Sequence, residues 1–206
     1  MPAIFDTVIV DYGMGNLLSV EKAVAAVGGR PLISSDPEAI FNAERLILPG
    51  VGAFGDAMQN LARNGLDDAI RTAVRAGKPL LGLCLGLQLL FSKSEEFGRH
   101  EGLDLIPGVV RRFDDSTLRV PHVGWNQIES ARPDPLLNNI PDGSYFYFVH
   151  SFFVEPVRPE DVLAWTSYGR SFCSIASRDK VRGAQFHPEK SQEMGKRLLR
   201  NFLAVR

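Results

Sequence analysis

The sequence has 206 residues, 45% of them apolar and 23% charged, which suits a chain that buries one large core. Its formal net charge of -1 leaves no basic surface for nucleic acid and no polybasic stripe for a membrane, so we expect neither partner. The first ten residues lack the basic segment of a secretory leader, no apolar stretch is long enough to span a bilayer, and the two cysteines form no disulfide or metal pattern. We therefore expect a cytoplasmic protein without metal or cofactor.

Predicted strands and helices alternate along the first half of the chain. Runs of β-branched or apolar residues mark the strands, and helical spacing that ends at glycine marks the helices. The predicted strands cover 6–12, 45–48 and 79–83, and the predicted helices cover 16–29, 56–76 with a break near 64–65, and 85–93. Such alternation predicts an α/β fold in which a mostly parallel central sheet is flanked by helices.

The second half is rich in predicted strands and closes with a helix. The strands cover 108–113, 121–129, 144–156, 162–169, 171–177 and 180–186. Residues 191–205 are expected to form an amphipathic helix capped by Ser191. No linker or repeat interrupts the pattern, so we expect a single domain over residues 1–206, with additional antiparallel strands in the C-terminal half.

The most informative stretch is LGLCLGLQLLF at 81–91, in which glycines flank a thiol. Gly82, Cys84 and Gly86 form the G-x-nucleophile-x-G pattern, with cysteine in place of serine, at a predicted strand-to-helix junction. A nucleophile on so tight a turn takes a strained backbone conformation, and glycine two residues to either side removes the collisions. The helix that follows directs its amides at the sulfur and favours the thiolate. A cysteine that only packs in the core is the alternative.

A thiolate nucleophile needs a base and a group that orients the base. His187 lies at the end of a predicted strand in AQFHPEKS, with Glu189 two residues further on. Pro188 fixes a bend there, so the carboxylate can reach the far ring nitrogen and hold its tautomer. A surface histidine beside a carboxylate is the alternative, but together with the cysteine turn the pair predicts a Cys-His-Glu set.

The third requirement is a place for negative charge on the substrate oxygen. Residues 49–52, PGVG, follow one predicted strand and precede a helix, and their two glycines allow backbone amides to face a ligand. Because parallel strands end at the same edge of a sheet, we expect this segment beside Cys84. A plain tight turn between strand and helix is the alternative.

The segments PGVG, GLCLGLQLL and QFHPEKS, in this order, resemble the class I (triad) glutamine amidotransferases. In that family a cysteine attacks the side-chain amide of glutamine, and the ammonia passes to a second site. The segments VDYGMGNLLSV, PHVGWNQI, YFVHSF and HPEKSQEMGKRLLRNFL further resemble the branch of the family that forms the glutaminase subunit of imidazole glycerol phosphate synthase, in histidine biosynthesis.

The resemblance implies a role for each matching residue. Cys84 is the acylated nucleophile, His187 its general base and acid, and Glu189 the orienting group. The oxyanion would be held by the amides of Gly50, Val51, Gly52 and Leu85, and the glutamine by Gln88, Glu96, Ser151 and Phe152. The family often has tyrosine where Phe152 stands, so no hydroxyl contact is expected there. A neighbouring carboxylate, Glu95, leaves open which of the two acids binds the ammonium group of the substrate.

The resemblance also implies a partner, a cyclase with a (β/α)8 barrel that forms a heterodimer with the glutaminase, receives its ammonia and makes imidazole glycerol phosphate and AICAR. The positions that match this interface are Asn16, Trp125, Asn126, Tyr147 and Lys190. Without the resemblance, Trp125 would be interpreted as a core residue and Lys190 as a solvated charge.

Other polar residues have plainer interpretations. Cys173 is expected to be a small buried strand residue and His100 a loop residue, while His122 and His150 have no partner visible in the sequence. Two other classes of protein also stay open. One is a stand-alone thiol hydrolase or a different amidotransferase subunit, such as the one serving pyridoxal phosphate synthesis, against which PHVGWNQ argues. The other is a binding or redox-sensing module, against which the intact HPE segment argues.

Overall fold

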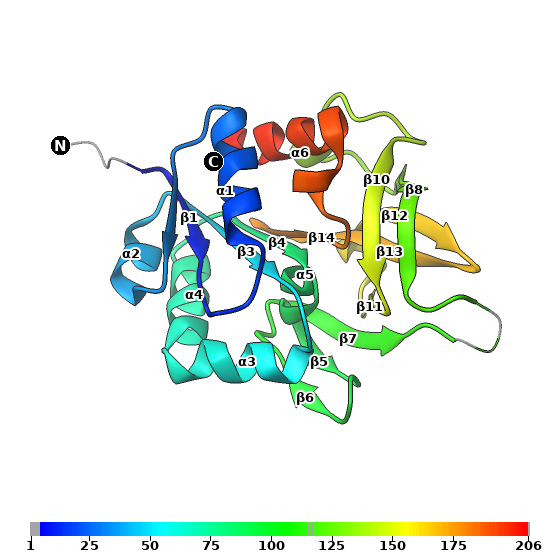
Figure 1. Cartoon of the computed structure of the whole chain (residues 1–206), viewed down its shortest axis with the longest axis horizontal. Coiled ribbons are helices and arrows are strands. Elements are labelled where there is room, and N and C mark those ends of the chain that lie inside the picture. The colour runs from blue at the N-terminus through cyan, green and yellow to red at the C-terminus, as the bar shows by residue number, and fades with distance from the viewer. Residues whose placement is uncertain (1–4, 115, 117, 206) are drawn as a thin grey trace.

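A computed structural model describes residues 5–114, 116 and 118–205 of the chain (Figure 1). Its helices are α1 (Leu17–Ala26), α2 (Pro37–Asn42), α3 (Phe54–Arg63), α4 (Leu66–Arg75), α5 (Leu85–Leu89) and α6 (Gln192–Ala204), and short 3-10 helices cover Pro135–Leu137, Pro159–Asp161 and Pro188–Lys190. Its strands are β1 (Thr7–Val10), β2 (Pro31–Ser34), β3 (Arg45–Gly50), β4 (Leu80–Cys84), β5 (Phe91–Ser94), β6 (His100–Glu101), β7 (Ile106–Arg112), β8 (His122–Gln127), β9 (Glu129–Ser130), β10 (Tyr145–His150), β11 (Phe152–Pro156), β12 (Val162–Tyr168), β13 (Arg170–Arg178) and β14 (Val181–Ala184).

The central sheet is parallel in one half and mostly antiparallel in the other. Its strand order is β2-β1-β3-β4-β14-β13-β11-β7-β5-β6, with β12 and β9 alongside β13. The pairs from β2 to β14 are all parallel, whereas β13 is antiparallel to β14, β11 to β13 and β7 to β11. The prediction of a mostly parallel sheet flanked by helices, with antiparallel strands added by the C-terminal half, is confirmed.

Helices cover both faces of this sheet (Figure 1), and the strands bury side chains on both. Successive strand residues point to opposite faces, so Val8 and Val10 of β1 pack in one core with α3 and α4. Ile9 between them packs in the other core with Val20 of α1 and Phe202 of α6. Burial on both faces explains why the parallel strands are continuous apolar runs rather than alternating ones.

Strands β8 and β10 form a separate two-stranded antiparallel sheet beside the main one (Figure 1). Its inner face carries Phe146 and Phe148, which belong to the same core as α6. Its outer face carries large apolar side chains that stay exposed, namely Val123, Trp125, Tyr145 and Val149. This outer face is called the β8–β10 face below.

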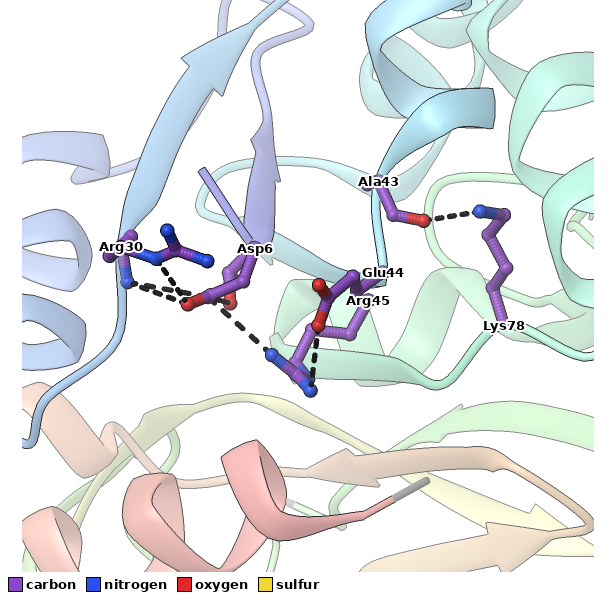
Figure 2. A network of polar contacts seen from close by, with 7 residues as sticks. Asp6, Arg30, Ala43, Glu44, Arg45 and Lys78 are labelled. Atoms are coloured by element: carbon purple, nitrogen blue, oxygen red, sulfur yellow. Dashed lines mark hydrogen bonds and ion pairs between the residues drawn. The ribbon is translucent and has the colours of Figure 1, made fainter. Parts of the chain in front are cut away.

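Polar contacts tie the amino ends of the parallel strands together (Figure 2). Asp6, just before β1, receives Arg30 Nε at 3.2 Å and Arg45 Nη1 at 3.5 Å from the starts of β2 and β3. Lys78, before β4, donates to the carbonyl of Ala43. These contacts fix the register at one edge of the sheet, and the opposite, carboxyl edge is where α/β folds build their sites.

Three sequence predictions about local structure are wrong. The helix predicted over 85–93 ends at Leu89, because Phe91 is fully buried and pairs with Ile106 of β7 instead. The strand predicted over 144–156 divides at Ser151 into β10 and β11, which belong to different sheets. His100, predicted in a loop, lies in the short strand β6.

The ends of other elements agree more closely with the prediction. The helix predicted over 56–76 breaks at Gly65 into α3 and α4, as expected. Ser191 does stand at the start of α6, but its hydroxyl makes no cap and bonds elsewhere. The strand β2 and helix α2 were not predicted. Of the predicted range 1–206, residues 1–4 and 206 lie outside the described part. Within that part, no helix is long and apolar enough to cross a membrane.

Candidate active site

Cys84 is the last residue of β4, and α5 begins at the next residue. Its backbone has φ 55° and ψ -111°, a conformation that costs a non-glycine residue about 1–3 kcal/mol. A side chain at Gly82 would place Cβ 2.5 Å from the carbonyl oxygen of Gly86, and one at Gly86 would overlap the carbonyl of Leu48. The predicted strained turn and the predicted reason for its glycines are confirmed.

The thiol of Cys84 opens into a cavity of about 990 Å³ at the carboxyl edge of the sheet. Only 7% of Cys84 is exposed, and its sulfur lies 3.8 Å from both the carbonyl oxygen of Val149 and Nε2 of Gln185. The cavity brings together most of the predicted site, namely Val51, Gly52, Cys84, Leu85, Gln88, Glu96, Ser151, Phe152 and His187. Segments far apart in the sequence therefore converge on one sulfur.

His187 and Glu189 form a buried pair next to that sulfur. Nδ1 of His187 lies 2.8 Å from Oε1 of Glu189, and their side chains are 6% and 2% exposed. Burial alone would lower the pKa of His187, but hydrogen bonds to Cys84 and Glu189, and the charges of both groups, raise it to about 9. Nε2 of His187 has no other hydrogen-bond partner among the described residues, which leaves it to act on the sulfur and its substrate.

The backbone around His187 is anchored to the strand β10. The amide of His187 donates to the carbonyl of Tyr147 at 2.9 Å, and the hydroxyl of Ser191 donates to the carbonyl of His187 at 2.6 Å. The same hydroxyl accepts from the amide of Tyr147 at 3.0 Å. This explains why Ser191 does not cap α6, because its oxygen holds the bend that brings Glu189 to the imidazole.

The PGVG segment lies beside the nucleophile. Gly50, the last residue of β3, is the register partner of Cys84, and a Cβ on Gly50 would meet Cβ of Leu85 at 3.0 Å. Val51 is 44% exposed, and Gly52 has φ 96°, a value that suits glycine. The amides at Val51 and Leu85 are therefore carried by two chain turns that flank the sulfur, as an oxyanion hole requires.

Tyr12 is a site residue that the sequence reasoning missed. Its hydroxyl donates to the carbonyl of Pro49 at 2.9 Å, and its side chain is 2% exposed. Burial, and then the charge of Cys84, raise its pKa, which keeps the phenol neutral as a donor. Its position directly after β1, followed by glycine, was the available signal, since strand ends in parallel sheets carry site residues.

Glu96 is buried at the cavity wall and Glu95 is exposed. Oε2 of Glu96 accepts from the amide of Phe54 at 2.6 Å, at the start of α3. Burial raises the pKa of Glu96, although that hydrogen bond opposes the rise. Glu95 instead pairs with Arg111 at 3.4 Å. Since both line the cavity, burial singles out Glu96 as the carboxylate better suited to a ligand cation.

Gln88 and Phe152 are connected to each other. The amide nitrogen of Gln88 donates to the carbonyl of Phe152 and to Oε1 of Gln185, both at 3.1 Å. The carbonyl of Ser151 accepts from the amide of Phe113 at 3.0 Å, which joins this wall to β7. Gln88 therefore holds the wall of the cavity, whichever contact it also makes with a ligand.

Four of the five predicted interface residues lie on the outer surface near the β8–β10 face. The rings of Trp125 and Tyr147 meet edge to face with centroids 6.1 Å apart, and Lys190 Nζ lies 5.8 Å from the Tyr147 ring. Trp125 is 46% exposed, so the alternative interpretation as core is wrong. Asn16 lines a small cavity with Val51. Asn126 differs, because its amide is engaged within the chain, as described below.

The remaining residues carry no chemistry of their own here. Cys173 is buried in β13, as predicted, and burial raises the pKa of its thiol. Within the described ranges, no group of three or more His, Cys, Asp or Glu side chains is arranged to hold a metal ion.

A family model described as glutamine amidotransferase class-I matches residues 8–205. The chain belongs to the class I glutamine amidotransferase family. Solved structures share its fold. One described as a glutamine amidotransferase aligns with a TM-score of 0.75 and 21% identity over 95% of this chain and 96% of that one. PurLQS from Thermotoga maritima aligns with a TM-score of 0.75 and 19% identity over 96% of both chains.

Curated relatives narrow the family further, since each is named imidazole glycerol phosphate synthase subunit HisH. The relative from Syntrophotalea carbinolica is 50% identical over 201 residues, 95% of this chain and 98% of its own. Those from Moorella thermoacetica and Methanosarcina barkeri are 52% and 51% identical, over 94% and 95% of this chain and 92% and 96% of theirs. Within the class I amidotransferases, the chain is a member of the HisH family.

Proposed function

We propose that this HisH family member hydrolyses L-glutamine to glutamate and ammonia with Cys84, His187 and Glu189, in one amidotransferase domain over residues 1–206. The sulfur attacks the side-chain amide carbon, and the amides of Val51 and Leu85 stabilise the oxygen anion that forms. His187 gives a proton from Nε2 to the departing nitrogen, so the C–N bond breaks and ammonia leaves a glutamyl thioester. Water then attacks the thioester, and His187 takes its proton as the C–S bond breaks.

The observation that supports this proposal best is the strained turn at Cys84 facing a buried histidine that already has its carboxylate. A cysteine in ordinary packing does not need φ 55°, and the HisH relatives are named for the same synthase. Glu189 holds the Nδ1 proton of His187 at 2.8 Å and leaves Nε2 toward the sulfur.

A glutamine-mimicking electrophile tests the assignment. We expect one adduct per chain, on Cys84, detected by mass spectrometry of the intact protein and its peptides. Cys84→Ala should lose both the adduct and glutamine hydrolysis, whereas Cys173→Ala is the matched control and should keep both. An adduct on Cys173, or unchanged hydrolysis by Cys84→Ala, would contradict the proposal.

The names of the relatives also support a partner, and we propose a cytoplasmic heterodimer with a cyclase subunit built as a (β/α)8 barrel. The exposed apolar side chains of the β8–β10 face, with Asn16, Tyr147 and Lys190 close by, suit such a docking surface. Direct transfer would keep ammonia from being protonated in water, where it is no longer a nucleophile.

Co-purification with the cyclase tests the partner, and glutamine hydrolysis tests its effect. We expect a low rate for the chain alone, and a higher rate with the cyclase and its substrate bound. The double variant Val123→Ser and Tyr145→Ser should weaken co-purification without lowering the unpartnered rate. A stable monomer that ignores the cyclase and hydrolyses glutamine at full rate would contradict the heterodimer.

A further inference from the structure

Two histidines that the mechanism does not use are buried between the β8–β10 face and the cavity. His122 of β8 and His150 of β10 are register partners, 3% and 6% exposed. Aromatic rings enclose them: His122 stacks on Tyr168 with centroids 4.0 Å apart and on Phe148 at 5.0 Å. An imidazole pair in so apolar a setting needs a reason, because leucine or phenylalanine would pack there without polar atoms to satisfy.

Hydrogen-bond geometry fixes where each proton lies. Nδ1 of His150 is 2.7 Å from the carbonyl oxygen of Phe152, which can only accept, so this nitrogen carries the proton. Nε2 of the neutral ring then accepts from Nδ1 of His122 at 3.0 Å. Nε2 of His122 in turn accepts from the amide nitrogen of Asn126 at 3.2 Å.

The far end of the chain of bonds is fixed as well. The nitrogen of the Asn126 side chain also donates to the carbonyl of Ser167 at 2.9 Å, and its oxygen accepts from the amide of Gln127 at 2.8 Å. Each bond therefore has one donor and one acceptor, and both histidines carry their proton on Nδ1 and are neutral.

The near end of this chain of bonds is the cavity wall. The carbonyl of Phe152 accepts from His150 and from Gln88, and Gln88 also donates to Gln185, whose amide lies 3.8 Å from the sulfur of Cys84. A polar path thus runs from Asn126 on β8 to the nucleophile, through the carbonyl that fixes the substrate-side wall.

We propose that His122 and His150 are positioning residues for glutamine, a neutral relay that holds the Phe152 carbonyl and, through it, Gln88 in the binding geometry. This rests on the proposed glutaminase function and deepens it, because neither ring needs to touch the reacting atoms. The relay works only with one proton per ring, since a second proton on His150 would set N–H against N–H across the 3.0 Å contact with His122.

The surroundings favour this neutral state. Burial lowers the pKa of His122 to about 4. Burial also lowers the pKa of His150 to about 3, and the charges of His122 and His187 lower it further. The titratable groups that face the pair are therefore each other, His187 and the phenol of Tyr168, none of which supplies a negative charge at neutral pH.

Nitrogen-15 NMR of the histidines in the full chain tests the relay without any activity. We expect the rings of His122 and His150 to be Nδ1–H tautomers whose shifts stay constant from pH 5.5 to 8. A proton on Nε2 of either ring, or an ordinary titration near pH 6.5, would overturn the proposal. The outcome does not depend on glutamine, so it separates failure of the relay from failure of the proposed function.

Kinetics of a matched pair tests the positioning role. In His122→Asn the amide nitrogen can take the place of Nδ1 and donate to His150, whereas in His122→Gln it takes the place of Nε2 and leaves His150 without a donor. Both lose the same aromatic stacking. With the cyclase bound, we expect KM for glutamine to be roughly tenfold higher in His122→Gln than in His122→Asn, consistent with one lost buried hydrogen bond. Equal KM values for the two folded variants would overturn the proposal.

Discussion

Replacing Gly86 with alanine should damage the protein more than any loss of side-chain contact would suggest. The new Cβ would overlap the carbonyl oxygen of Leu48 in β3, and that carbonyl is backbone, so no rotamer change can relieve the overlap. Either α5 moves away from β3 or β3 moves away from β4. Both movements separate Gly50 from Cys84, which are register partners.

The magnitude follows from the rigidity of these neighbours. Overpacking a core costs about 1–3 kcal/mol when side chains can adjust. Here Leu48 and Gly86 are both fixed within the sheet and helix, so we expect the upper end, about 3 kcal/mol, or a melting temperature lower by roughly 10 °C for a domain of this size. The turn that carries the oxyanion amides shifts as well, so glutamine hydrolysis should fall further than stability alone explains.

Urea unfolding of the variant, compared with Gly65→Ala, measures this cost. Gly65 has φ 66° and nothing within 4 Å of an added Cβ, so alanine there should cost only the left-handed strain, about 1 kcal/mol. If Gly86→Ala were no worse than Gly65→Ala and kept wild-type hydrolysis, the steric account of the cysteine turn would be refuted.

Three further predictions concern individual site residues. His187→Asn should abolish glutamine hydrolysis as fully as Cys84→Ala, whereas Glu189→Gln should leave a measurable rate, because it weakens only orientation; equal and small effects in steady-state assays would contradict both roles. Since the pKa of His187 is raised from 6.5 to about 9, its contribution to stability is complete below pH 6.5 and is lost as the pH rises through 9. The unfolding free energy of wild type minus that of His187→Asn should therefore decline across this window, by up to about 3 kcal/mol, and a difference that grew with pH would refute the assignment. Tyr12→Phe should destabilise by about 1 kcal/mol and lower kcat more than it raises KM, because Pro49 leads into the oxyanion segment; an effect on KM alone would argue against that link.

What could be predicted from the sequence was set by local constraints. The glycines around Cys84 and the HPE segment each act within a few residues, so their spacing alone indicated the turn and the pair. The alternation of strands and helices gave the sheet, because burial on both faces leaves continuous apolar runs in the sequence. The HisH resemblance added roles for residues such as Gln88, whose spacing alone indicates a buried amide.

What escaped prediction depends on residues far apart in the chain. His122 meets His150 only because β8 and β10 pair, and Tyr12 reaches Pro49 only across neighbouring strand ends. The helical content of 85–93 gave way at Phe91 because burial against β7 outweighs helix propensity over so short a segment. Ser191 has the right residue type for a cap, but His187 and Tyr147 compete for its oxygen.

The seam between β11 and β13 gives the sheet a line of weakness. The two strands share one register pair, Val154 with Cys173, whereas β11 pairs with β7 along its whole length. Elements joined by few backbone bonds exchange their amide hydrogens from a separate, lower-energy opening. Cys84 lies on one side of the seam and the cavity wall at Phe152 on the other, so a bound glutamine bridges two cooperative units. Substrate should therefore slow amide exchange in β11 far more than in β4, acting as a clasp across the sheet.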